Sequence, residues 1–277
     1  MPEFFAIKSN KPMDSFLVKL VIIQERLSCW FADHVITVTD LWRVRLVSRG
    51  VESKKVSVVM NVADDRYFYP RNAHSDEINS KDQLHLIYHG TFKEHYGMKE
   101  LIQSIDLARK EVPGVRLKIQ GVGEYYNEMA RLVEELGLEN EVEINNFAIP
   151  VYDLPELISR ADMGVIPNRN DLFSGELLPT KMLEYIALNK PVIASKTKVI
   201  SQYFDENMVL FFNPGDPESL SEEIVYAYQH WDEMIEKRKN FNRFTSIYNW
   251  QVISQNYVEL VNKLADRAFL KFFRFFP

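Results

Sequence analysis

From residue 84 onward, short apolar runs alternate with segments whose apolar residues recur at helical spacing, and this alternation constrains the fold more than any other feature. The spacing of Met98, Leu101, Ile102 and Ile105 is typical of a helix that buries one face. Strands that alternate with such helices predict an α/β fold with a parallel, doubly wound sheet. Strands are predicted at 84–88, 115–119, 142–145, 163–166, 191–194 and 209–212, and later helices at 129–136, 153–160, 180–188, 217–237 and from 250.

The first third of the chain has a different pattern. Residues 1–13 show no helical period, and Pro2 and Pro12 argue against a helix there. A helix is predicted over 14–31, with apolar residues around most of its circumference, so it requires cover on several sides and predicts self-association where no partner covers it. Two strands at 34–39 and 56–60, a helix at 40–49 and a polar linker at 62–82 complete this part.

Composition excludes several functional classes. The net charge of −6 does not favour binding to nucleic acid. The single cysteine, Cys29, excludes an intramolecular disulfide framework and fits a reducing compartment. The sequence shows no secretory signal pattern and no apolar run of the roughly 20 residues that span a membrane, so we expect a cytoplasmic protein.

Residues 171–195 carry the strongest candidate for chemistry. Glu176 and Glu184 flank seven residues, and Thr180 and Lys181 begin the short helix that Pro179 opens. Unpaired N–H groups, a hydroxyl and an ammonium at one helix start form an anion site. A carboxylate one turn further on, at Glu184, can accept hydrogen bonds from a sugar. The alternative is that both glutamates are solvated surface residues.

This arrangement resembles the E-x7-E signature of retaining glycosyltransferases of family 4, which have the two-domain GT-B fold. The likeness is to members that read Pro-Thr/Ser-Lys-x-x-Glu-Tyr before a Lys-Pro-Val strand. The resemblance implies that Glu176 meets the donor sugar and Glu184 the ribose of a nucleotide-sugar. It also implies that Lys181 and the helix start at Thr180 stabilise the leaving diphosphate, with retention of configuration at the sugar.

The N-terminal part resembles the end of the acceptor domain in the same family. The carrying segments are Ala32-Asp-His-Val-Ile-Thr-Val38, Arg49-Gly-Val51 and Lys55-Val-Ser-Val-Val-Met-Asn61. We therefore expect 1–61 to be a remnant of the acceptor domain, 62–247 a donor-binding Rossmann-like domain, and 248–277 a crossover helix with an aromatic tail. Most of the acceptor domain, with its glycine-rich loop and catalytic histidine, would then be missing.

The loop predicted at 89–97 lies at the end of the first strand of the donor-binding domain. Gly90 allows close backbone approach to a phosphate, and Thr91 adds a hydroxyl. Family members commonly have an arginine and a lysine where this chain has Thr91 and Tyr96. The resemblance therefore leaves Lys181, Lys93 or His95 to supply positive charge, whereas His89 and His95 read as polar loop residues rather than metal ligands.

Two further strand ends and one loop complete the predicted donor site. Gly121 and Gly123 either approach a nucleotide closely or form a tight turn that needs positive φ. Phe147 either stacks on a base or belongs to the core, and the backbone near Ala148 meets the base in the resembling family. Arg169 either contacts phosphate or sugar or is a solvated loop residue.

No cluster of metal-ligating residues and no phosphate-binding loop of the Walker type occurs in the sequence, so we expect a metal-independent enzyme with no cofactor. The aromatic tail, Phe269–Pro277, either packs on the first domain or contacts a membrane peripherally at its inner face.

Three alternatives to an active transferase remain. They are a non-catalytic nucleotide-binding module, one subunit of a split enzyme that requires an acceptor-domain chain, and a sugar-nucleotide epimerase, whose acidic and histidine set is not evident.

Overall fold

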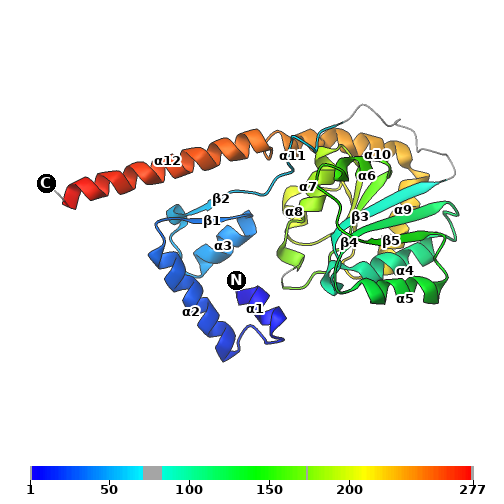
Figure 1. Ribbon diagram of the computed structural model, residues 1–277, viewed down its shortest axis with the longest axis horizontal. Helices are drawn as coiled ribbons and strands as arrows, with labels where there is room; N and C mark the ends of the chain where they lie inside the picture. Colours follow the sequence, from blue (N-terminus) through cyan, green and yellow to red (C-terminus); the bar gives the residue numbers. More distant parts are fainter. Residues whose placement is uncertain (1, 71–82, 173, 276–277) are drawn as a thin grey trace. The chain divides into compact units, whose positions relative to one another are not determined.

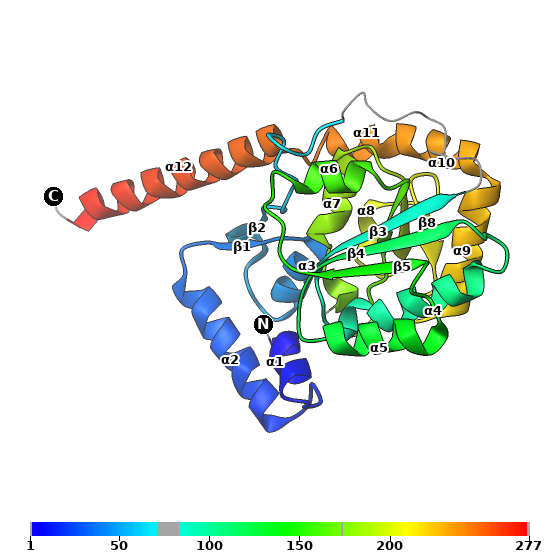
Figure 2. The same ribbon diagram turned by 45° about the vertical axis from the view of Figure 1, so that its right-hand side comes forward.

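The computed structural model describes residues 2–70, 83–172 and 174–275, and side chains as far as Asp266. The chain divides into two compact units (Figures 1 and 2). One unit comprises Met1–Val62 with Ile247–Pro277, and the other comprises Ala63–Ser246. Each unit is described by itself below.

The larger unit is built on a six-stranded sheet in which every paired neighbour is parallel. Its strand order is β5-β4-β3-β6-β7-β8. The chain builds β3, β4 and β5 in one direction, then returns to place β6 on the other side of β3. The strands are β3 (Leu84–Thr91), β4 (Val115–Val122), β5 (Val142–Asn146), β6 (Met163–Ile166), β7 (Val192–Ser195) and β8 (Leu210–Phe212).

Helices cover the sheet, and the apolar faces predicted from the sequence form its core. The helices α4 (Met98–Ala108), α5 (Tyr126–Leu136) and α9 (Pro217–Gln229) share one buried cluster with side chains from β3, β4 and β8. In Figure 1, α6 (Leu154–Ser159) and α7 (Thr180–Ala187) lie on the other side of the strands from α4 and α5. The predicted α/β class with a parallel sheet is thus confirmed.

The strands β3 and β4 extend further than the sequence analysis predicted. His89, Gly90 and Thr91, predicted as loop residues, continue β3, and Gly121 continues β4 in register with Gly90. Gly121 has no positive φ, so the tight-turn interpretation is wrong. A Cβ atom on Gly121 would lie 1.7 Å from the carbonyl oxygen of Gly90, so glycine is required there for close packing.

Several helices also differ from prediction. The helix predicted over 217–237 is two helices, α9 and α10 (Trp231–Arg238), because His230 between them leaves the helical region with φ −122° and ψ 45°. Several short elements were not predicted, since they lack a full period of apolar residues. They are 3₁₀ turns at Glu94–Tyr96, Ser174–Glu176 and Lys239–Phe241, and short helices α8 (Ile200–Tyr203) and α11 (Asn242–Thr245).

The smaller unit holds a two-stranded parallel sheet of β1 (Val35–Thr37) and β2 (Val56–Val58), joined by α3 (Asp40–Ser48) and a 3₁₀ turn at Ser53–Lys55. The unit also contains α1 (Pro2–Lys8), α2 (Phe16–Phe31) and α12 (Trp250–Phe275). The expectation that residues 1–13 form no helix is wrong, because Pro2 occupies the first helical position, where its missing N–H costs nothing.

Ion pairs hold the helices of this unit together. Buried Glu3 of α1 pairs with Arg45, at 3.0 Å, and with Arg49 at the end of α3. Arg49 also donates to Glu25 of α2 at 2.7 Å. By contrast, α2 exposes a row of large apolar side chains, including Trp30 (78%) and Phe31 (86%). The cover that its composition requires is therefore not supplied by the described residues of this chain.

The structure bears on the predicted membrane contact and linker only in part. No helix among the described residues is both long and apolar enough to cross a membrane. The side chains of the aromatic tail and most of the predicted linker, 71–82, lie outside the described residues. Membrane contact by the tail therefore stays a prediction.

Replacing Gly121 with alanine tests the close packing of β3 against β4. The added methyl group meets a backbone oxygen that cannot rotate away, so we expect the free energy of unfolding to fall by roughly 1–3 kcal/mol or more. Urea unfolding measures the change. The matched control is Gly137→Asn, because that position has open space and φ +60°, which asparagine tolerates. Equal stability of Gly121→Ala and wild type would contradict the observed strand register.

Candidate nucleotide-sugar site

The start of α7 lies against the end of β3, where the strand order reverses between β3 and β6. In open parallel sheets, ligands bind beyond the carboxyl ends of strands at such a reversal. A Cβ atom on Gly90 would lie 3.1 Å from Cε of Lys181, so the side chain of Lys181 passes directly over the glycine. The predicted residues Gly90, Thr91 and Lys181 are therefore neighbours in the structure.

Lys181 is held by aromatic side chains rather than by a carboxylate. Its ammonium donates a hydrogen bond to the Tyr88 hydroxyl at 2.8 Å and lies over the rings of Tyr88 and Tyr96, at 4.2 and 4.9 Å from their centroids. Aromatic faces attract a cation but do not replace its hydration fully. Burial therefore lowers the pKa of Lys181 to about 7, with Glu184 opposing the shift.

Glu184, one turn further along α7, is bound to a buried histidine. Its Oε2 lies 2.5 Å from Nε2 of His89, and Nδ1 of His89 lies 3.0 Å from the Tyr185 hydroxyl. His89 is 5% exposed, so its interpretation as a polar loop residue is wrong. The Glu184 side chain keeps 19% of its surface exposed and so remains accessible to a ligand.

Local sequence explains why α7 begins and ends where it does. Pro179 is the N-cap residue rather than the first helical one, with ψ 127°, and Thr180 follows as the exposed first residue of the helix. At the other end, Asn189 adopts a left-handed conformation with φ 56°. The N–H groups of Asn189 and Lys190 then bond to the carbonyls of Ile186 and Tyr185, which completes a Schellman cap.

Glu176 ends a short 3₁₀ turn in the loop that leads to α7. The turn is anchored by Ser174, whose hydroxyl donates to the backbone oxygen of Arg169 at 2.7 Å. Its backbone N–H donates to Asp171 Oδ1 at 2.7 Å. Gly175 packs tightly here, since a Cβ atom would lie 2.4 Å from Oδ1 of Asn170. The loop thus holds Glu176, half-buried, at a fixed position before the helix.

Arg169 is bound to two carboxylates. Its guanidinium contacts Glu100 of α4 at 2.7 Å and Glu94 at 3.1 Å, and these pairs raise its pKa above the ordinary value against the opposing effect of burial. Its backbone N–H donates to the carbonyl of His95 at 3.2 Å. Arg169 therefore joins the loop after β6 to the loop after β3, and its positive charge is already balanced by Glu100 and Glu94.

The remaining predicted residues lie at the ends of β4 and β5. Gly123 passes close to β3, because a Cβ atom there would lie 2.2 Å from the carbonyl oxygen of Phe92. Phe147 is 56% exposed, so the interpretation that it belongs to the core is wrong. Its carbonyl oxygen accepts a hydrogen bond from Gln120 at 2.6 Å, which fixes the backbone beside Ala148.

The sequence analysis did not assign Tyr88, Tyr96 and His89 to the site. Tyr96 was noted only because it replaces a lysine, and Tyr88 only as part of a strand. The position of Tyr88 offered a weak signal that it belongs to a site. It ends a predicted buried strand, and the hydroxyl of a buried tyrosine requires a polar partner. That partner, Lys181, is 93 residues away in sequence, at a distance that no local pattern spans.

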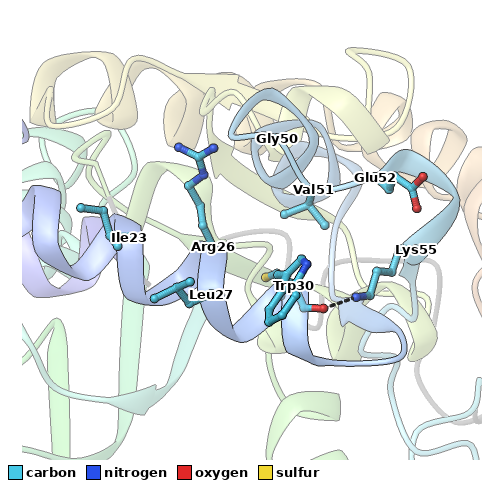
Figure 3. Close-up of a pocket in the computed structure, with 9 residues that line it drawn as sticks. Ile23, Arg26, Leu27, Trp30, Gly50, Val51, Glu52 and Lys55 are labelled. Carbon is cyan, nitrogen blue, oxygen red and sulfur yellow. Dashed lines mark hydrogen bonds between the residues drawn. The ribbon is translucent and has the colours of Figure 1, made fainter.

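The described residues contain no group of three metal-ligating side chains. A pocket of about 440 Å³ does occur, but it lies in the smaller unit (Figure 3). It is lined by Ile23, Leu27 and Trp30 of α2 and by residues 50–52 and Lys55, whose ammonium donates to the Trp30 carbonyl at 2.7 Å. None of the predicted site residues lines this pocket.

The parallel strand order, which reverses between β3 and β6 beside a helix start, defines a Rossmann-like domain. The chain belongs to the glycosyl transferases group 1 family, whose model matches residues 70–245. It is 22% identical to a candidate colanic acid biosynthesis glycosyltransferase, WcaL of Escherichia coli (strain K12), over 84% of this chain and 57% of that relative. The chain thus spans little more than half of that relative's length.

Two solved structures share the fold. Anabaena Alr3699/HepE, in complex with UDP and glucose, superposes with a TM-score of 0.73 at 18% identity, covering 87% of this chain and 66% of that one. Sucrose-phosphate synthase from Thermosynechococcus elongatus has a TM-score of 0.74 at 22% identity, covering 90% of this chain and 62% of that one. These similarities confirm the predicted GT-B architecture.

The lowered pKa of Lys181 predicts a pH-dependent stability. An unfolded lysine keeps its proton to about pH 10.5, whereas folded Lys181 releases it near pH 7, so folding releases a proton between these values. The free energy of unfolding of wild type should therefore rise with pH over this window, relative to Lys181→Met, by at most about 1.4 kcal/mol per pH unit. Urea unfolding from pH 6 to 10 measures the difference. Parallel pH profiles for the two proteins would contradict the buried position of the ammonium.

Proposed function

We propose that this chain is the donor-binding half of a glycosyltransferase that transfers a sugar from a nucleotide-sugar, with retention of configuration and without a metal ion. The observation that carries the proposal is the placement of Lys181 and Glu184 on the first two turns of α7, beside Gly90, at the reversal of the sheet. A cation and a glycine beside one another suit a phosphate group, and a carboxylate one helical turn further on suits the ribose that follows it.

The residues take distinct roles in this proposal. Lys181, with the N–H groups at the start of α7, stabilises the negative charge that develops on the leaving diphosphate. Glu176 holds hydroxyl groups of the donor sugar, and Glu184 holds the ribose. Exposed Phe147 supplies a flat surface for the base, next to the backbone at Ala148. Arg169 is assigned a supporting role instead of the predicted ligand contact, because Glu94 and Glu100 already neutralise it.

The lowered pKa of Lys181 fits a site that awaits an anion. Without ligand, burial disfavours the charged form of this amine and lowers its pKa to about 7. A diphosphate at the start of α7 would favour the charged form, because an opposite charge nearby stabilises the ammonium. The ligand's negative charge is then met by a cation that has little competing hydration, which strengthens the contact.

A second candidate is a nucleotide-binding module that needs another chain for activity, as in a split enzyme. One observation favours it, because α2 exposes an apolar face without cover from the described residues. Turnover by this chain alone would contradict this candidate. A cytoplasmic location, with peripheral membrane contact, stays a prediction.

Thermal unfolding with UDP, GDP and ADP in parallel tests the donor site. UDP is included because the Anabaena structure contains it. Ligand at about one hundred times its dissociation constant stabilises a protein by roughly 2.7 kcal/mol. We expect one nucleotide to raise the unfolding midpoint by roughly 5–10 °C. If none of the three shifts the midpoint, the proposed donor site is wrong.

Two glutamate variants separate the parts of the donor. Glu184→Ala should weaken binding of the nucleoside diphosphate by about 1–3 kcal/mol, because a charged hydrogen bond to the ribose is lost. Glu176→Ala should leave that affinity unchanged and weaken only the nucleotide-sugar. Isothermal titration calorimetry measures both, with exposed Glu111→Ala as the matched control. Equal effects of the two variants on the nucleoside diphosphate would contradict the assigned roles.

A further inference from the structure

We infer that His89 is a positioning residue for the donor site, because it fixes the carboxylate of Glu184 in the orientation that receives the ribose. The inference rests on the proposed function of this site. His89 lies at the carboxyl end of β3, 95 residues before Glu184 in sequence, and is buried. Its side chain is the contact through which the sheet determines where the Glu184 carboxylate points.

A chain of hydrogen bonds fixes the imidazole itself. The carboxylate of Glu184 accepts hydrogen bonds, so Nε2–H of His89 donates to its Oε2, at 2.5 Å. Nδ1 of the same ring then faces the Tyr185 hydroxyl at 3.0 Å, and this hydroxyl lies 3.2 Å from the carbonyl oxygen of Ile87. The imidazole therefore has one ring nitrogen facing the core and the other facing the ligand site.

Packing leaves this ring no alternative position. The ring of Tyr185 meets the imidazole edge-on, with centroids 5.1 Å apart and planes at 78°. On its other side, Tyr185 fills the space that Gly164 of β6 leaves open, since a Cβ atom there would lie 2.2 Å from Cδ2 of the tyrosine. Gly164, Tyr185 and His89 thus form a packed row that ends at the carboxylate.

As a consequence, the two carboxylate oxygens of Glu184 have different surroundings. Oε2 is held by His89, whereas Oε1 makes no hydrogen bond within the described part of the chain. With 19% of its surface exposed, the side chain presents Oε1 to a ligand. A carboxylate held in this way needs no reorientation on binding, so less side-chain entropy is lost when a ribose hydroxyl donates to it.

The two amide variants of His89 separate the nitrogens of the imidazole. In His89→Gln, the amide nitrogen occupies the place of Nε2 and can donate to Glu184. In His89→Asn, the shorter side chain reaches only the place of Nδ1, near Tyr185. A residue that merely fills space would tolerate both changes equally, whereas a positioning residue is rescued by glutamine alone.

The experiment compares the nucleoside diphosphate that binds wild type, UDP in the first instance, with its 2′,3′-dideoxy analogue by calorimetry. Wild type and His89→Gln should prefer the ribose form by about tenfold, the fold-change of one hydrogen bond. His89→Asn should lose that preference while it binds the dideoxy analogue as wild type does. Thermal unfolding confirms that each variant is folded.

Other outcomes overturn the inference in distinguishable ways. If His89→Asn keeps the preference for the ribose form, His89 does not position Glu184. If it loses affinity for both nucleotides equally, the role is structural support only. If wild type binds both nucleotides without preference, the ribose contact of Glu184 is wrong as well, and if wild type binds neither UDP, GDP nor ADP, the proposed donor site fails together with the inference.

Discussion

The close approach of α7 to the end of β3 is the contact on which the site depends. Gly90 lacks a side chain, and the aliphatic part of Lys181 occupies the space above it. The ammonium then lies over two tyrosine rings, and no carboxylate among the described residues accepts a hydrogen bond from it. A charge in such surroundings is costly, and its lowered pKa expresses that cost. An anion bound beside Lys181 would stabilise its charged form, as the proposed donor site requires.

The groups around this lysine are paired in ways that limit their movement. His89 holds Glu184, and Arg169 is balanced by Glu94 and Glu100. Pairing satisfies buried polar groups, whose desolvation otherwise destabilises the fold. It also fixes side chains before a ligand arrives, and preorganised dipoles and charges are what stabilise a developing charge without reorganisation. The same contacts thus serve both the stability and the proposed chemistry of the domain.

The two units of the chain differ in how far their apolar surfaces are covered. The larger unit has a continuous core under its six-stranded sheet and contains every residue of the proposed site. In the smaller unit, the described residues form two paired strands, and α2 leaves much of its apolar surface exposed. An exposed apolar surface of this kind is suited to a contact with another protein surface.

Much of the fold followed from local patterns. The alternation of apolar runs and amphipathic segments predicted a parallel α/β sheet, and Pro179 predicted where α7 begins. The glutamates at 176 and 184, with Lys181, predicted an anion and sugar site, because these residue types lie within one loop and one helix. The predictions of strands and helices succeed where the physical cause lies within a few residues of its effect, and the predicted anion and sugar site stays a prediction.

Other features were decided by contacts across the sheet. The length of β3 and the burial of His89 differed from prediction, and the sequence left open whether Phe147 is exposed, since each depends on which strand or helix lies alongside. The partners of Lys181 and Glu184, at Tyr88 and His89, are more than 90 residues away in sequence. The sequence by itself determined the class of fold and predicted the residues that we propose bind a nucleotide-sugar. Only the tertiary structure decided how those residues are paired and charged, because desolvation and hydrogen bonding depend on neighbours that folding brings together.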